Sequence, residues 1–140
     1  MRLSLFALLL FVPVAVADDV EPKEKKIVAR EIKVAGLPKV RRAFKEPVKI
    51  TSQAELEKAI EDKEARANVL KEVDLKKEFL LFFQWAGSGK DLLEMQEKDG
   101  VQTFTYYVGR TKDLRIHVKL FALPLKTEYK LPKAPYPLAK

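Results

Sequence analysis

Residues 79–85 read Phe-Leu-Leu-Phe-Phe-Gln-Trp and contain one polar side chain, Gln84. A strand with one face in water alternates apolar and polar residues, because successive side chains point to opposite faces of the sheet. A nearly continuous apolar run is instead typical of a central strand covered on both faces. We therefore expect residues 79–85 to form the central strand of the core.

A tight turn is predicted at Lys98-Asp99-Gly100. Asp-Gly favours a two-residue hairpin turn, because both central positions of that turn need a positive φ. Alternating segments flank it at residues 92–97 and 101–108, so these two segments are expected to form a β-hairpin.

The next alternating segment predicts a strand from residue 114 that ends at Pro124. Its apolar set is expected to be buried: Leu114, Ile116, Val118 and Leu120. The other set is expected to be mostly exposed: Arg115, His117, Lys119 and Phe121.

A helix is predicted to start at Ser52, because Ser52 and Glu55 form a capping-box pattern. An apolar side continues through residues 56–60 and resumes at Ala65, Val69 and Val73. No glycine or proline interrupts residues 52–73, so one bent helix and two short helices both fit this pattern.

The remaining segments flank this core. Residues 27–50 contain one or two possible strands, with Pro47 confined to an edge position; whether they join the main sheet is left open. Residues 125–140 contain three prolines and four lysines, which is typical of an extended tail. Residues 27–124 are expected to form a single α+β domain, with a helix or helix pair packed on a mainly antiparallel sheet of four to six strands that includes a four-stranded meander.

The first 17 residues resemble a secretory signal peptide. Arg2 precedes an apolar run at residues 3–16, and Ala15-Val16-Ala17 fits a signal peptidase site. Residues 18–26 are mostly charged and are expected to form a disordered leader. The chain is therefore expected to be exported, to the periplasm or medium, with no transmembrane segment after cleavage. Because it has no cysteine, it is unlike the small disulfide-rich scaffolds of secreted proteins.

Catalytic and metal motifs are incomplete. The segment Gly87-Ser88-Gly89-Lys90 matches neither the phosphate-binding P-loop, which requires G-x-x-x-x-G-K-[ST], nor the G-x-S-x-G nucleophile elbow. With one histidine and no cysteine, a zinc site is close to excluded, and no calcium-loop pattern is present. We predict no metal and no cofactor.

Two polar segments adjoin the predicted core strands, and loops beside rigid strands are frequent binding sites. The candidate residues for ligand or partner binding are Trp85, Ser88, Lys90, Arg110, Asp113, Arg115 and His117. The guanidinium groups of Arg110 and Arg115 offer planar forks for carboxylates, whereas the excess of basic residues is ordinary for solubility. We expect a non-enzymatic domain that binds another protein or an anionic envelope polymer, and not nucleic acid, which exported proteins seldom meet. The alternative is a hydrolase with an unfamiliar site around Ser88 and His117.

The block from residue 50 to residue 123 resembles small exported bacterial proteins of unassigned function. The segments that carry this resemblance are Ile50-Thr51-Ser52, Glu55-Leu56, Val73-Asp74-Leu75, residues 80–83, residues 87–89 and residues 110–115. A capped helix followed by a strand that ends in a Gly-rich loop is also similar to the C-terminal domain of PrcB-type subunits, which accompany secreted proteases. Those domains carry a Thr-Gly-Gly-Tyr-like loop, whereas this chain has residues 87–90 without the tyrosine. The resemblance implies accessory binding in place of catalysis.

Overall fold

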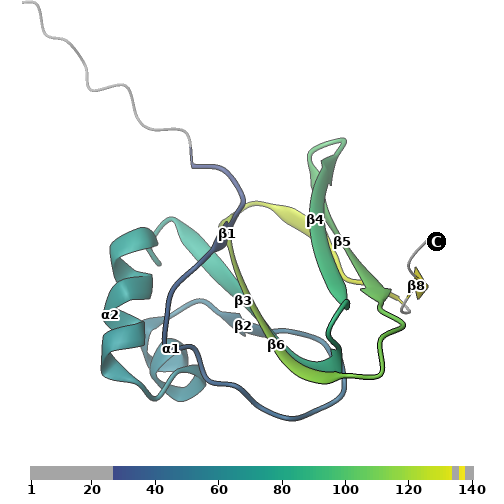
Figure 1. Ribbon diagram of the computed structural model, residues 1–140. Coiled ribbons are helices and arrows are strands. Elements are labelled where there is room, and N and C mark those ends of the chain that lie inside the picture. Colours follow the sequence, from purple (N-terminus) through teal and green to yellow (C-terminus); the bar gives the residue numbers. More distant parts are fainter. Residues whose placement is uncertain (1–26, 134–135, 138–140) are drawn as a thin grey trace, which may run out of the picture.

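The computed structural model describes residues 27–133 and 136–137 (Figure 1). The predicted signal peptide at 1–17 and leader at 18–26 lie outside the described residues. None of the described helices combines the length and apolar composition that a membrane crossing needs.

Two helices and two sheets make up the described fold, which confirms the α+β class. The helices are α1 (Gln53–Ala59) and α2 (Lys63–Glu72). Sheet A has the strand order β1 (Arg30–Ile32), β6 (Leu114–Pro124), β3 (Glu78–Ser88) and β2 (Val48–Ile50). Sheet B has the order β4 (Leu92–Lys98), β5 (Val101–Val108) and β7 (Glu128–Lys130), and β8 (Tyr136–Pro137) also pairs with β5. The helices lie on one side of sheet A and sheet B lies on the other (Figure 1).

Strand β3 is the central strand that its apolar sequence predicted. Leu80 and Phe82 pack into a core that contains the helices, while Leu81 and Phe83 pack into a second core that contains β4 and β5. The polar exception, Gln84, donates to the Pro38 carbonyl at 2.7 Å. Two buried faces therefore explain why this strand has no polar side.

The four-stranded meander was wrong, although the hairpin within it is confirmed. Strand β3 pairs with β6 along its whole length, while β4 and β5 pair with each other in sheet B. Asp99 and Gly100 adopt φ values of 53° and 76°, as the hairpin turn requires. The strands divide between two sheets because the second apolar face of β3 needs its own cover.

Two helices form, and each has its own N-cap. The Ser52 hydroxyl accepts from the Glu55 N–H at 3.3 Å, which confirms the predicted start. The Asp62 carboxylate accepts from the Ala65 N–H at 2.7 Å and begins the second helix. The Glu55 carboxylate accepts from the Thr51 N–H at 2.6 Å, one residue before the expected capping-box partner.

The flanking segments complete both sheets. Strands β1 and β2 are the edges of sheet A, so residues 27–50 do join the main sheet. Strand β7 pairs in parallel with β5, and Tyr129 and Leu131 pack on the second core. Part of the expected tail is therefore extended but packed.

The burial prediction for β6 was wrong near both ends of the strand. Leu114 and Ile116 are 57% and 37% exposed, whereas Phe121 is only 3% exposed. The apolar core beneath the helices includes Leu120 but not Leu114 or Ile116, so the first half of β6 extends beyond that cover. Phe121 faces the other way and is buried against sheet B.

Candidate functional site

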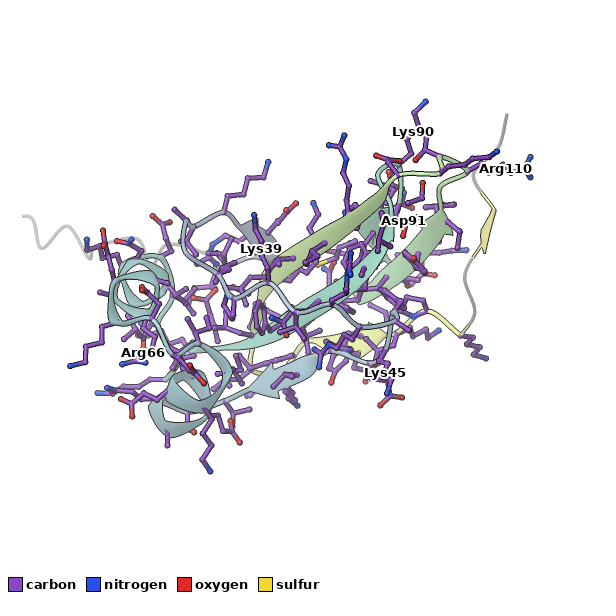
Figure 2. The ribbon with its side chains drawn as sticks, turned by 60° about the horizontal axis from the view of Figure 1, so that its bottom comes forward. Lys39, Lys45, Arg66, Lys90, Asp91 and Arg110 are labelled. Atoms are coloured by element: carbon purple, nitrogen blue, oxygen red, sulfur yellow. The ribbon has the colours of Figure 1, made fainter. Side chains whose placement is uncertain are left out.

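The pairing of β3 with β6 brings the predicted site residues together at one end of sheet A. Trp85 lies opposite His117, and Ser88 lies opposite Leu114. Lys90 and Arg110 lie at the same end of the molecule (Figure 2). We call this region, residues 86–91 and 109–117, the open end of sheet A.

The Ser88 hydroxyl joins two loops of the open end. It accepts hydrogen bonds from the backbone N–H of Thr111 at 3.0 Å and of Lys90 at 3.3 Å. It also shares a hydrogen bond of 2.5 Å with the Thr111 hydroxyl. Ser88 therefore holds its own loop and the loop before β6 in one arrangement.

His117 contacts the same serine through the backbone and not through the hydroxyl. Its Nε2 lies 2.8 Å from the Ser88 carbonyl oxygen, which can only accept, so Nε2 carries the proton. The imidazole stacks on the Trp85 indole with centroids 4.8 Å apart. A serine nucleophile needs a base at its hydroxyl, and here His117 directs a donor at the carbonyl instead.

Trp85 lies in the core, as the apolar run of residues 79–85 predicted, although it was also a candidate for partner binding. Its side chain is 1% exposed and belongs to the core between the sheets. It therefore cannot contact a partner directly. Its indole instead supports the stacked His117 imidazole from the core side.

Asp91 links both sheets beneath the open end, and sequence reasoning missed this role. Its carboxylate accepts hydrogen bonds from Trp85 Nε1 at 3.1 Å, the Tyr106 hydroxyl at 2.7 Å and the Gly109 N–H at 2.8 Å. Burial, together with the hydrogen bond and the charge of Asp91, raises the pKa of Tyr106, so this phenol stays protonated and donates. A single aspartate in a Gly-rich loop gives no local sign of partners that lie 15 or more residues away.

Gly109 allows the two loops to approach each other closely. A Cβ placed there would lie 2.5 Å from the Lys90 carbonyl carbon and 2.6 Å from the Ser88 hydroxyl. The contact with Lys90 is to the backbone, which cannot move aside as a flexible side chain could. The loops can therefore pack this closely only if residue 109 has no side chain.

Asp113 connects the loop after β3 to the start of β6 at the exposed side of the open end. Its carboxylate accepts from the Gly89 N–H at 3.2 Å and from Arg115 Nε at 2.8 Å. A hydrogen bond from the Thr111 side chain, with smaller contributions from Gly89 and Arg115, lowers the pKa of Asp113 to about 2.

The lowered pKa of Asp113 predicts acid sensitivity of the open end. Because the folded pKa lies below the unfolded one, the ionised carboxylate contributes stability above about pH 4, and this contribution is lost as the pH falls towards 2. Urea unfolding of the wild type and of Asp113→Asn should therefore differ above pH 4 and converge at lower pH. A difference that stayed constant from pH 7 to pH 2 would contradict this assignment.

The outer surface of the open end combines apolar and cationic side chains. Leu114 and Ile116 are among the exposed large apolar residues of the described chain. The exposed cations at this end are Lys90, Arg110, Lys112 and Arg115. Arg115 has a side-chain exposure of 70% although it pairs with Asp113. Leu114 and Ile116 were missed as surface residues because alternation alone predicted them to be buried.

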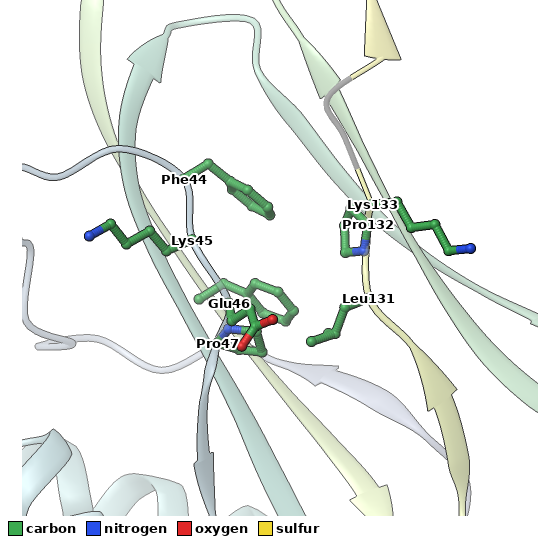
Figure 3. Close-up of a pocket in the computed structure, with 8 residues that line it drawn as sticks. Phe44, Lys45, Glu46, Pro47, Leu131, Pro132 and Lys133 are labelled. Atoms are coloured by element: carbon green, nitrogen blue, oxygen red, sulfur yellow. The ribbon is translucent and has the colours of Figure 1, made fainter.

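A separate cleft of about 280 Å³ lies away from the open end (Figure 3). It lies between residues 44–47 and residues 131–133. The Phe44 ring points into it, whereas the Lys45 and Lys133 side chains point away on opposite sides (Figure 3). Its volume is just below the range of about 300–1,000 Å³ that is usual for small-molecule sites. The predicted site residues do not line it.

Within residues 27–133 and 136–137, no three acidic, histidine or cysteine side chains gather so that they could hold a metal ion. Comparisons with family models, curated proteins and solved structures find no match to this chain. The geometry of the open end is therefore the main indication of what this chain does.

Proposed function

We propose that this protein is an exported, non-enzymatic binding domain that recognises another protein through the open end of sheet A. The observation that carries the proposal is that the open end exposes Leu114 and Ile116 together with four cationic side chains. Exposed apolar residues rimmed by polar ones are typical of protein interaction sites.

The hydrogen bonds beneath this surface support a binding role. Ser88, Asp91 and Asp113 each accept from backbone groups of neighbouring loops, so the loops are held before any partner arrives. A surface ordered in advance loses less conformational entropy on binding.

A protein partner fits this surface better than an anionic envelope polymer. Cations alone would be enough for a polymer, and such binding would weaken strongly with salt. Leu114 and Ile116 add apolar area that a protein side chain can cover. The resemblance to accessory subunits of secreted proteases agrees with a partner of this kind.

The hydrolase alternative gains no support from the same geometry. The Ser88 hydroxyl is bonded to Thr111, and His117 is bonded to the Ser88 carbonyl oxygen. Proton transfer from Ser88 to His117 would require both hydrogen bonds to be exchanged.

Affinity capture from the exported proteins of the native host tests the proposal. The bait variants are Leu114→Ser and Arg115→Ser, and the matched control is Leu70→Ser, which replaces an exposed leucine of α2 outside the open end. A partner should be retained by wild type and by Leu70→Ser and lost with both site variants. Calorimetry with the purified partner should then show at least a tenfold rise in Kd for each site variant, roughly one 1.4 kcal/mol step.

Two results would reject the assignment. One is a partner that binds the site variants as tightly as it binds wild type. The other is turnover of ester, peptide or glycoside substrates that disappears in Ser88→Ala and His117→Ala, which would establish the hydrolase.

A further inference from the structure

The first half of β6 is an open strand edge. Strand β1 pairs only with residues 120–122, whereas β3 pairs with β6 from residue 114 to residue 124. Over residues 114–118, β6 therefore has a strand on one side only within the described part of the chain.

The direction of the backbone groups on this edge follows from the register. Just beyond the two ends of the β3–β6 ladder, the Gly89 N–H donates to the Asp113 carbonyl and the Leu125 N–H donates to the Lys77 carbonyl. Residues of an antiparallel strand alternate between bonding to one neighbour and pointing away from it. Odd-numbered residues of β6 thus bond to β3, and even-numbered residues point away from it.

Leu114 and Ile116 are even-numbered residues on the open part of this edge. Their backbone N–H and C=O groups point away from β3, and no backbone partner bonds to them among the described residues. Their side chains are also exposed. The most exposed apolar residues of β6 are therefore the ones that offer free backbone groups.

We propose that this edge binds an acidic, extended segment of the partner as an added antiparallel or parallel strand. This inference rests on the function proposed above and specifies how the partner is bound. Main-chain hydrogen bonds to Leu114 and Ile116 would provide the pairing, as in other cases of strand addition.

Charge favours an acidic segment. The open end has four exposed cations, Lys90, Arg110, Lys112 and Arg115, against two carboxylates, Asp91 and Asp113. A strand that alternates acidic and apolar residues would place its acids beside Arg115 and its apolar side chains beside Leu114 and Ile116.

A second copy of this chain fits the edge less well. Antiparallel pairing centred on Ile116 would place Leu114 opposite Val118, which is acceptable for packing. It would also bring together two chains of net charge +7 at their cationic ends. Like charges at a contact are unfavourable, so we choose the acidic segment as the occupant.

Labelled peptides test the occupant. The acidic probe is a fluorescein-labelled peptide in which glutamate and valine alternate over eight positions. One control replaces each glutamate with lysine, which reverses the charge; the other places all the glutamates before all the valines, which keeps the composition without the alternation. Fluorescence anisotropy should give a Kd for the acidic probe at least about tenfold lower than for either control. Equal affinities for the three peptides would overturn the proposal.

Two variants and one spectroscopic measurement test the edge. Ile116→Pro removes an outward N–H, and the control Leu70→Lys changes an exposed leucine of α2 that lies outside the open end. Both should fold; Ile116→Pro should weaken binding of the acidic probe at least about tenfold, whereas Leu70→Lys should keep the wild-type Kd. In the wild type, NMR hydrogen exchange of the Leu114 and Ile116 amides should slow about tenfold or more on binding, while Arg115 and His117, already bonded to β3, change little. If Ile116→Pro does not fold, the exchange rates of the wild-type Leu114 and Ile116 amides decide whether the peptide pairs with this edge.

The outcomes separate this inference from the proposed function. A natural partner that depends on Arg115 but leaves the Leu114 and Ile116 amides unprotected would overturn strand addition and leave the binding function standing. Protection that grows with protein concentration without peptide would identify a second copy as the occupant and overturn the acidic segment.

Discussion

Asp91→Ala is expected to lower the free energy of unfolding by about 3–5 kcal/mol. The alanine leaves three donors without their acceptor: Trp85 Nε1, the Tyr106 hydroxyl and the Gly109 N–H. Trp85, Tyr106 and Gly109 are buried, and each unsatisfied buried donor costs about 1–3 kcal/mol. Water can reach part of the half-buried site and replace some of these hydrogen bonds, so the total cost stays below the full cost of three unsatisfied donors. Urea denaturation followed by tryptophan fluorescence measures the difference.

Matched variants identify the source of this effect. Tyr106→Phe removes one donor and keeps the ring, so it should cost about 1–2 kcal/mol. Asp91→Asn keeps an acceptor oxygen and should fall between the two. A loss of less than about 1 kcal/mol for Asp91→Ala would mean that water or a rearranged loop replaces the carboxylate, and Asp91 would then not be the link between the sheets.

Arg30→Ala is expected to cost about 3 kcal/mol. Glu78 is 2% exposed, and both of its carboxylate oxygens interact with the Arg30 guanidinium. Arg30 also donates to the Glu72 carbonyl at the end of α2, so it connects β1, α2 and β3. Removing one partner of a buried ion pair costs about 3–5 kcal/mol because the other charge stays buried. We take the lower value because the Arg30 side chain is 34% exposed.

A double variant separates charge burial from packing. Arg30→Leu combined with Glu78→Leu removes both charges, and such replacements are often neutral or stabilising. The double variant should therefore be more stable than Arg30→Ala in thermal and urea unfolding. If both variants lost the same stability, the loss would come from the contact of Arg30 with α2 and not from the ion pair with Glu78.

Local patterns in the sequence predicted the elements that depend on neighbours along the chain. The Asp99-Gly100 turn and the Ser52 cap are decided by a few adjacent residues, and both formed as predicted. The long apolar run predicted a strand covered on both faces, because that pattern reports burial directly.

The sequence predicted the candidate site residues but not that they lie together. The register of β3 with β6 brings Ser88 and the segment from Arg110 to His117 to one end of sheet A. Trp85 was predicted both in the doubly covered strand and in the candidate site; it is buried as the strand prediction requires, which excludes direct contact with a partner. Leu114 and Ile116 were misplaced because alternation does not indicate how far the helices extend along a sheet.

The sequence by itself determined the α+β class, the hairpin, the start of the helical segment and the central strand, because each depends on residues close together along the chain. Only the tertiary structure decided that the strands divide between two sheets, that Asp91 joins them and that one edge of β6 stays open. These features depend on contacts between distant segments. Their geometry is set by the packing of whole layers, which no single segment encodes.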